Sequence, residues 1–348
     1  MKDADLKKLL EMQDEKIRIS TEDEGKLKKL AGMLNSAKNV IVSGEGDKFI
    51  IPLVSKYLID AYSDKKFEVY NARVLANYTP ESISKESLVI FLTVRGKNID
   101  ILDAIKEVKK KNATIIIITQ LESKDKDSIY SSLKGYKNYE IFIPVKNETI
   151  TVPSTTTSNT FLSVLNTIII YFLEDKINIE PLLMSQLVDL PVYFNLLSKN
   201  KSFHEWCIES SKKIKELNNP LLFFIGDGPR YPSCKKAAQI QFLEQCKLVS
   251  SAVQSEEFIN LILEEYLVKN LNQIWILLKP IEHFVSVQAM NRFNEMHLMI
   301  SEKFDKSRII VVDPSSFITF SGEGKRNDII LSPIYTLMIE WLSYYYCA

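Results

Sequence analysis

The stretch Val40-Ile41-Val42-Ser43-Gly44-Glu45-Gly46-Asp47 decides the fold. A short β-branched run ends there in a Gly-x-Gly turn, and an apolar helical pattern follows from Phe49 to about Tyr62. The same construction returns as Leu222-Phe223-Phe224-Ile225-Gly226-Asp227-Gly228-Pro229, again ahead of a helical pattern. Two copies of a strand, a glycine turn and a helix predict two similar α/β domains, each with a ligand site at the end of its first strand.

Apolar strand patterns alternate with helical patterns around both copies. In the first half, the expected strands cover residues 40–42, 67–70, 88–93, 115–118 and 141–145, and an apolar helix covers 154–172. In the second half, strands are expected near 221–225, 249–253, 274–278 and 309–313. Continuous apolar strands are typical of a parallel sheet covered on both faces. We therefore predict two tandem flavodoxin-like three-layer α/β/α sandwiches with parallel sheets.

The predicted domain limits follow the change from one pattern to the next. Residues 1–36 are charge-rich with a helical pattern, 37–180 hold the first α/β domain, and 181–348 hold the second domain with its linking helices. The balance of 44 Lys+Arg against 44 Asp+Glu leaves no net field to recruit nucleic acid or an anionic membrane. The N-terminus lacks the apolar core of a signal peptide, and the apolar stretch 161–172 is too short to span a bilayer.

The four cysteines, at 207, 234, 246 and 347, show no C-x-x-C spacing. Without that spacing, reduced and mostly buried thiols in a cytoplasm are expected rather than a metal or redox role.

Glycine is scarce, with 10 residues in the chain, and four of the ten stand in the two Gly-x-Gly turns. Each turn allows a close backbone approach ahead of a helix N-terminus, which favours an anion, although a plain packing turn has the same sequence. A fifth glycine, Gly96, follows the central strand in Thr93-Val94-Arg95-Gly96-Lys97-Asn98. Loops after adjacent strands converge, so Lys48, Arg95 and Lys97 are candidates for a phosphate site, the alternative being a solvated basic loop.

Two further segments carry candidate chemistry. Val152-Pro153-Ser154-Thr155-Thr156-Thr157-Ser158 is a hydroxyl-rich helix start that offers N-caps and donors to an anion. Glu244 stands in an apolar segment that predicts partial burial, and burial makes a carboxylate a better general base near neutrality. A surface Glu244 paired with Lys247 or Lys236 is the alternative. Of the three histidines, only His283 falls at an expected strand end.

Taken together, these residues resemble the sugar isomerase (SIS) family of tandem phosphosugar-binding domains, which includes the isomerase half of glucosamine-6-phosphate synthase and the fructosamine-6-phosphate deglycases. The resemblance covers about residues 37–347 and rests on order and spacing. The family motif Gly-Arg-Gly-Pro-x-Tyr-Pro is similar to Gly226-Asp227-Gly228-Pro229-Arg230-Tyr231-Pro232, and the family's first glycine turn is similar to Gly44-Glu45-Gly46-Asp47-Lys48. Its Ser-x-Ser-Gly-Glu-Thr phosphate loop falls on residues 93–98 and its Val-Ala-Ser-Thr helix start on 152–155.

The resemblance implies a role for each matched residue. The implied phosphosugar-binding residues are Gly44, Gly46, Asp47, Lys48, Thr93, Arg95, Gly96, Lys97, Asn98, Ser154 and Thr155. The family's catalytic Glu falls on Glu244, and the family His that opens the sugar ring falls on Asn260, which cannot transfer protons near neutrality. The phosphate-loop serines are replaced, and the lysine of the family's C-terminal tail has no counterpart.

The resemblance implies a phosphosugar isomerase, or a deaminase or deglycase of an aminosugar phosphate, in which Glu244 moves a proton between C1 and C2. Asn260 and the missing tail lysine favour an alternative, a sugar-phosphate-binding sensor or regulator without catalysis. A nucleotide-binding Rossmann protein is a third alternative, against which the incomplete fingerprint counts. The expected partners are a small sugar phosphate and a second copy in a homodimer with shared active sites. No metal, cofactor, nucleic acid or membrane is expected, and the expected location is the cytoplasm.

Overall fold

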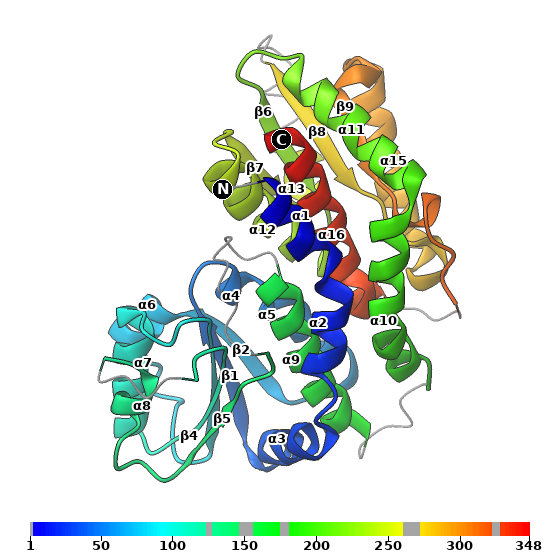
Figure 1. Cartoon of the computed structure of the whole chain (residues 1–348). Coiled ribbons are helices and arrows are strands. Elements are labelled where there is room, and N and C mark those ends of the chain that lie inside the picture. Colours follow the sequence, from blue (N-terminus) through cyan, green and yellow to red (C-terminus); the bar gives the residue numbers. More distant parts are fainter. Residues whose placement is uncertain (1–2, 123–126, 146–155, 175–180, 260–271, 322–327) are drawn as a thin grey trace. The chain divides into compact units, whose positions relative to one another are not determined.

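The computed structural model describes residues 3–122, 127–145, 156–174, 181–259, 272–321 and 328–348 (Figure 1). The chain divides into two compact units. We call Glu15–Glu180 the first unit, and Met1–Asp14 together with Pro181–Ala348 the second unit. The ranges 37–180 and 181–348 remain our proposed limits for the two repeated domains.

The first unit is built on a five-stranded parallel sheet with the order β2-β1-β3-β4-β5. Its strands are β1 Asn39–Gly44, β2 Lys66–Asn71, β3 Ser87–Thr93, β4 Thr114–Thr119 and β5 Tyr139–Phe142. Its helices are α3 Glu24–Ser36, α4 Asp47–Ile50, α5 Pro52–Tyr62, α6 Ala72–Asn77, α7 Ile99–Lys110, α8 Ile129–Ser132 and α9 Thr156–Glu174, and α2 Gln13–Ser20 crosses the division between the units.

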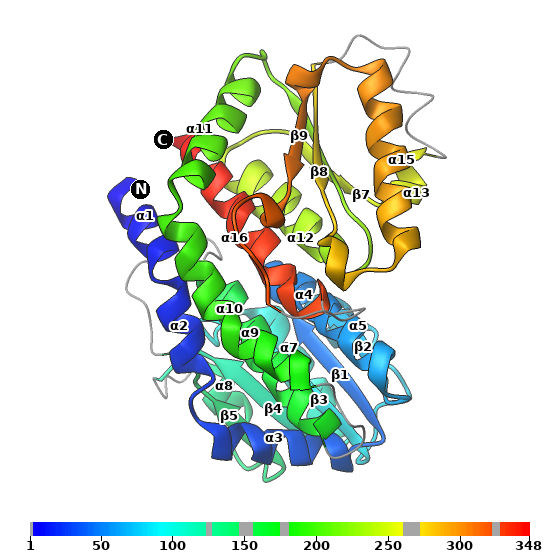
Figure 2. The ribbon, with the colours of Figure 1, turned by 90° about the vertical axis from the view of Figure 1, so that its right-hand side faces the viewer.

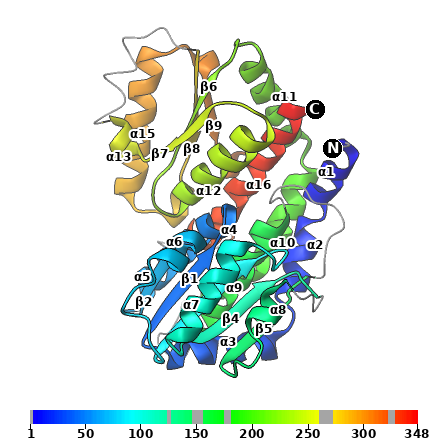
Figure 3. The same cartoon turned by 90° about the vertical axis from the view of Figure 1, so that its left-hand side faces the viewer.

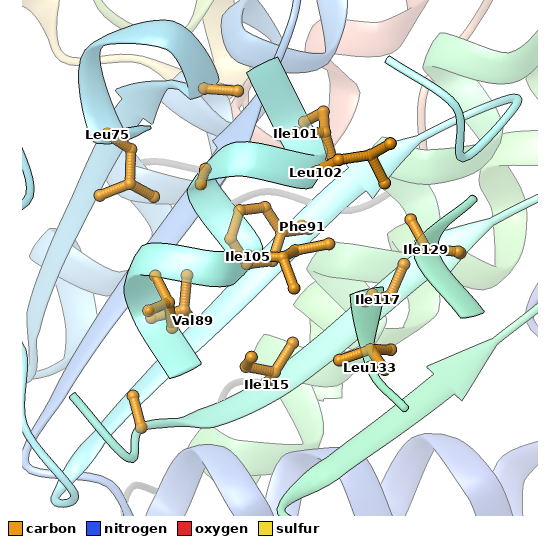
Figure 4. Packing of buried hydrophobic residues seen from close by; sticks show 14 of the residues in the cluster. Leu75, Val89, Phe91, Ile101, Leu102, Ile105, Ile115, Ile117, Ile129 and Leu133 are labelled. Atoms are coloured by element: carbon orange, nitrogen blue, oxygen red, sulfur yellow. The ribbon is translucent and has the colours of Figure 1, made fainter. Parts of the chain in front are cut away.

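Alternate strand residues pack on opposite faces of this sheet, because successive side chains of a strand point to opposite sides. Figure 4 shows Val89 and Phe91 of β3 and Ile115 of β4 packed against Ile105 of α7 in one buried cluster. Helices α6, α7 and α8 supply further members of that cluster. Helix α9 contacts both α3 and α5, and these three form the opposite layer (Figure 3). The predicted three-layer sandwich is confirmed.

The second unit repeats this plan on a four-stranded parallel sheet with the order β7-β6-β8-β9. Its strands are β6 Leu221–Ile225, β7 Ser250–Val253, β8 Gln273–Leu278 and β9 Ile309–Val312. Its helices are α1 Asp3–Glu11, α10 Pro181–Lys199, α11 Lys201–Lys215, α12 Tyr231–Lys236, α13 Ser255–Glu257, α15 Val287–Lys303 and α16 Asp328–Cys347, with a π-helix over Ala237–Gln245. Helices α13 and α15 cover one face and α11, α12 and α16 the other (Figure 2).

The nine predicted strands are confirmed among the described residues, and three helical features differ from expectation. The segment expected as one helical pattern from Phe49 has a turn at Ile51, which separates α4 from α5. Helix α6 follows the Asn71 N-cap and was not expected. The sequence pattern over 234–247 predicts a single helix, but the structure has a π-helix from Ala237 onward, and the hydrophobic pattern gives no sign of that change.

Candidate functional site

The strand order of the first unit creates a topological switch point between β1 and β3. Chain connections leave these two neighbouring strands in opposite directions, and such a topological switch point is where ligands bind in open α/β sheets. Gly44 at the end of β1 lies beside Leu92, one residue before the end of β3. The turn after Gly44 and the loop 93–98 therefore emerge side by side, as predicted for adjacent strand ends.

The turn at Gly44–Gly46 requires both of its glycines. A Cβ on Gly44 would lie 2.4 Å from the backbone oxygen of Lys48, so no side chain fits between the strand end and the following helix. Gly46 has a φ of +57°, which L-residues with a side chain adopt at a cost, and it directly precedes α4. Gly44 is therefore needed for packing against α4, as in the packing-turn alternative, and the approach of an anion to this turn stays a prediction.

Asp47 and Lys48 form a buried polar cluster beneath the turn. Lys48 Nζ lies 2.5 Å from Asp47 Oδ2 and donates to Thr157 Oγ1 at 3.1 Å, and both members of the ion pair are about 6% exposed. Ser158 Oγ donates to the same Asp47 carboxylate. These bonds tie the turn to the first turn of α9. The predicted contact of Lys48 and Asp47 with a phosphate stays a prediction, and the structure gives both side chains partners inside the protein.

The loop 93–98 holds its shape through its own polar groups. Thr93 Oγ1 accepts from the backbone N–H of Gly96 at 3.2 Å, and the Asn98 side chain caps α7 by accepting from Ile101 N. Gly96 has a φ of +58°, and a Cβ there would lie 2.7 Å from Leu121. Arg95 and Lys97 are exposed on this framework. The loop thus leaves two cations exposed at the switch point, whereas Thr93 and Asn98 hold its backbone conformation.

Glu45, Arg73 and Asp100 also lie at this strand edge, although sequence reasoning missed all three. Glu45 Oε1 accepts from the backbone N–H of Arg73 at 3.1 Å, at the first turn of α6. The Arg73 guanidinium in turn pairs with Asp100, 3.1 Å away at the start of α7. Asn71, an N-cap residue straight after a strand pattern, was the available signal for this helix start.

Three of the predicted site residues, Ser154, Thr155 and Asn260, lie outside the described residues. Thr157 and Ser158, two to four residues further on from the predicted hydroxyls, are described and contact Lys48 and Asp47. The hydroxyl-rich helix start therefore reaches the first glycine turn through these two residues.

The corresponding switch point of the second unit lies between β6 and β8. Asp227 in its glycine turn accepts from the backbone N–H of Ser255 at 2.9 Å and from the Ser255 hydroxyl. Arg230 Nη1 lies 2.8 Å from Asp328 Oδ2, and both side chains are under 10% exposed. Burial outweighs the attraction of Arg230 and raises the pKa of the Asp328 carboxyl.

The remaining charges at this second strand edge are paired as well. Lys279 Nζ after β8 lies 2.7 Å from Asp313 Oδ2 after β9. The Tyr335 hydroxyl donates to the backbone oxygen of Lys279, and burial raises the pKa of this hydroxyl. The cations Arg230 and Lys279 of the second switch point are therefore paired with acids, whereas Arg95 after β3 of the first unit is exposed.

Glu244 lies on the π-helix of the second unit and is exposed, so the predicted partial burial is wrong. The reason is the position of Glu244 on the outer side of the π-helix, while Gln241 and Phe242 fill the inner side. Lys236 pairs with Glu340 rather than with Glu244. A catalytic role for Glu244 stays a prediction.

The cysteines divide into two classes. Cys246 and Cys347 form a disulfide with Cα atoms 5.9 Å apart, so the expectation of reduced thiols is wrong for this pair. No local motif marks this pair, because 101 residues separate the two cysteines. Cys207 and Cys234 are free and buried, and burial raises the pKa of both thiols.

The histidines, as described, form no catalytic or metal constellation. His204 bonds to the Ser198 carbonyl through Nε2 at 2.8 Å and to the Tyr345 hydroxyl through Nδ1 at 3.1 Å. His283, in a 3₁₀ turn after β8, is exposed. Within the described ranges, no group of three or more His, Cys, Asp and Glu side chains is placed to hold a metal ion. Across the same ranges, no helix has the length and apolarity needed to cross a membrane.

Comparison with known proteins gives a consistent picture. The family model for the SIS domain matches residues 33–171. A glutamine–fructose-6-phosphate aminotransferase (isomerizing) from Clostridium tetani is 27% identical over 199 residues, which are 53% of this chain and 29% of that protein. This chain therefore spans less than a third of the length of that curated relative.

Solved structures share the fold over nearly the whole chain. Tagatose-6-phosphate ketose/aldose isomerase from Escherichia coli superposes with a TM-score of 0.74 at 12% identity, covering 98% of this chain and 91% of that one. The C-terminal domain of glucosamine-fructose-6-phosphate aminotransferase from Francisella tularensis gives a TM-score of 0.73 at 17% identity, with 98% and 93% covered. At such identities these structures establish the tandem α/β fold.

Proposed function

Because the family model for the SIS domain matches residues 33–171, we propose that this chain acts on a sugar phosphate, as an isomerase or as a deaminase or deglycase of an aminosugar phosphate. The observation that carries the proposal is the switch point between β1 and β3 of this same domain. There, two exposed cations, Arg95 and Lys97, lie on the loop that follows β3, beside the glycine turn that follows β1. Guanidinium and ammonium groups with close backbone N–H groups are the donors that bind phosphate in proteins.

In the proposed reaction, Glu244 is the base that moves a proton between C1 and C2 of the opened sugar. Its exposure leaves the carboxylate accessible, as a base that must reach a substrate carbon requires. The phosphate is held by the turn 44–48 and the loop 93–98, and Ser154 and Thr155 add hydroxyl donors. The resemblance to the family supports a homodimer with shared active sites, no cofactor and a cytoplasmic location, all of which belong to this proposal.

One sequence feature favours a second function, a sugar-phosphate sensor or regulator without catalysis. Asn260 stands where the resemblance implies a histidine, and an amide cannot supply the proton that ring opening needs. Such a protein keeps the phosphate site and changes its conformation or partners on binding.

Proton exchange in heavy water separates the two functions. The protein is incubated with a panel of hexose and hexosamine 6-phosphates in D₂O, and deuterium incorporation at C1 and C2 is followed by NMR. An enzyme incorporates deuterium, and Glu244→Gln abolishes that exchange. Glu209→Gln, which alters another exposed glutamate of the second unit, is the matched control and keeps the activity.

Ligand-induced thermal stabilisation is measured on the same samples. Stabilisation without deuterium incorporation for any sugar rejects the enzyme in favour of the sensor. If the protein shows neither thermal stabilisation nor deuterium incorporation with any sugar, the sugar-phosphate site itself is rejected.

A further inference from the structure

The π-helix of the second unit carries Glu244 and is held at both of its ends by one other helix. π-Helical turns are rare and usually limited to single-turn bulges, often at functional sites, whereas this π-helix extends over Ala237–Gln245. Helix α16, the last of the chain, contacts it. Such a helix needs tertiary contacts to keep its hydrogen-bond pattern, because the backbone by itself favours the α-helix.

The first anchor stands just before the π-helix. Lys236 Nζ lies 2.5 Å from Glu340 Oε1 of α16, and the two side chains are 1% and 2% exposed. Gln13 Nε2 donates to the second oxygen, Glu340 Oε2, at 2.7 Å. A buried ion pair is tolerated only in one well-bonded geometry, so these contacts fix the position of Lys236 relative to α16.

The second anchor stands just after the π-helix. The Cys246 N–H donates to the Gln241 carbonyl at 3.0 Å, which continues the π pattern, and its sulfur is bonded to Cys347 in the last turn of α16. Glu340 and Cys347 are seven residues apart, close to two helical turns, so they lie on one side of α16 and about 10 Å apart along it. Glu244 stands between the two anchors and two residues from the disulfide.

We propose that α16 positions Glu244 by anchoring the π-helix through Glu340 and Cys347, and that the Cys246–Cys347 bond makes this positioning sensitive to redox state. Glu340 and Cys347 are positioning residues, since they act through the π-helix. The proposal rests on the proposed function, because Glu244 is the base only in that function. The anchoring itself depends on the contacts alone.

The redox step exchanges one disulfide for another. A small-molecule disulfide such as glutathione disulfide accepts two electrons, the Cys246 and Cys347 thiols lose two protons as their S–S bond forms, and two small thiols leave. Cys347 is exposed and Cys246 is half-buried, so an exchange partner reaches this pair. Cys207 and Cys234 are buried and their thiol pKa values are raised, so they do not compete.

Hydrogen–deuterium exchange of the full chain tests the anchoring without reference to activity. Amides of residues 237–247 are expected to exchange several-fold faster after reduction by dithiothreitol than in the oxidised protein. Peptides from the first unit, such as 87–93, are expected to keep their rates. Cys347→Ser is the control, because it exchanges fast under both conditions. Equal exchange of 237–247 in the oxidised and reduced protein overturns the proposal.

Steady-state kinetics test the positioning of Glu244. Reduction and Cys347→Ser are each expected to lower kcat about 10- to 100-fold with little change in KM, because misplacing a base by about 1 Å costs that much while ground-state binding persists. Glu340→Gln is expected to act in the same direction. If that variant fails to fold, the double variant Lys236→Met/Glu340→Leu, which leaves no buried charge unpaired, replaces it.

The outcomes separate the two proposals. If hydrogen–deuterium exchange of residues 237–247 differs between the oxidised and reduced forms but kcat is the same in both, the positioning role is overturned. If that exchange differs and no sugar phosphate is turned over, the anchoring is supported and only the enzymatic function is rejected.

Discussion

At the end of β1 the turn Gly44–Gly46 is followed by Lys48, and at the end of β6 the turn Gly226–Gly228 is followed by Arg230. In both units this cation is buried, stands four residues after the first glycine and bonds to the first turn of a later helix. Lys48 reaches Thr157 of α9 and Arg230 reaches Asp328 of α16.

The two sites differ in where their negative charge comes from. Beside Lys48 the acid is its chain neighbour Asp47, and the helix adds the hydroxyls of Thr157 and Ser158. Beside Arg230 the helix itself provides the acid, Asp328. The second site therefore depends on one long-range charge pair, while the first spreads its bonds over several polar groups.

The next strand end shows a second difference. Arg95 after β3 is exposed, whereas Lys279 after β8 is paired with Asp313. The same topology thus leaves Arg95 exposed in the first unit and uses the corresponding cation for internal pairing in the second. We infer that a switch point becomes a binding site only where its charges are not already neutralised.

The largest expected effect comes from breaking the pair on which the second site depends. Arg230→Met leaves Asp328 buried without its partner, and we expect a loss of about 3–5 kcal/mol in the free energy of unfolding by urea. Adding Asp328→Leu removes the unpaired buried carboxyl and is expected to recover most of the lost free energy of unfolding. If the single and double variants are equally destabilised, the pair is not what holds this turn to α16.

The next effect sharpens the comparison between the two glycine turns. Gly44→Ala puts a methyl group 2.4 Å from the Lys48 backbone oxygen, and we expect a cost of about 1–3 kcal/mol because backbone must move. Gly226→Ala meets the Cys234 sulfur at 2.9 Å, and a side chain yields more easily than a backbone. Urea midpoints of the two variants give the comparison, and a larger loss for Gly226→Ala would contradict it.

A smaller effect concerns the two cations after the central strands. Arg95→Ala is expected to weaken binding of a sugar 6-phosphate about tenfold, about 1.4 kcal/mol, through the loss of a charge-assisted contact. Lys279→Ala, the matched change in the second unit, is expected to leave the affinity unchanged. Isothermal titration calorimetry measures both variants, and equal weakening would remove the distinction between the two switch points.

The smallest effect is a dependence of stability on pH. The Asp328 pKa is raised above its usual value of 3.8, so the folded protein keeps this proton at a pH where the unfolded chain has lost it. Asp328 therefore lowers stability as pH rises from 3.8 through its folded pKa, and the loss is complete above that value. Comparing urea midpoints of the wild type and Asp328→Asn across this window isolates the contribution, and parallel pH profiles would show that Asp328 makes none.

The sequence alone predicted the two parallel sheets. A strand buried on both faces must be apolar along its length, and a Gly-x-Gly turn can be recognised directly in the sequence. It also predicted that the turn at Gly44 and the loop at 93–98 meet, since adjacent parallel strands end at one edge. Bounds of the strands were predictable within a few residues for the same reason.

Only the tertiary structure decided how the charges are used. Lys48 and Arg95 look alike in the sequence, yet one is buried against Asp47 and the other is exposed. The partners Asp328, Glu340 and Cys347 come from about 100 residues away, and so does the α16 framework around the π-helix of Glu244. Local periodicity records which face of an element is apolar, whereas the partner of a buried charge or thiol depends on which distant helix the packing brings beside it.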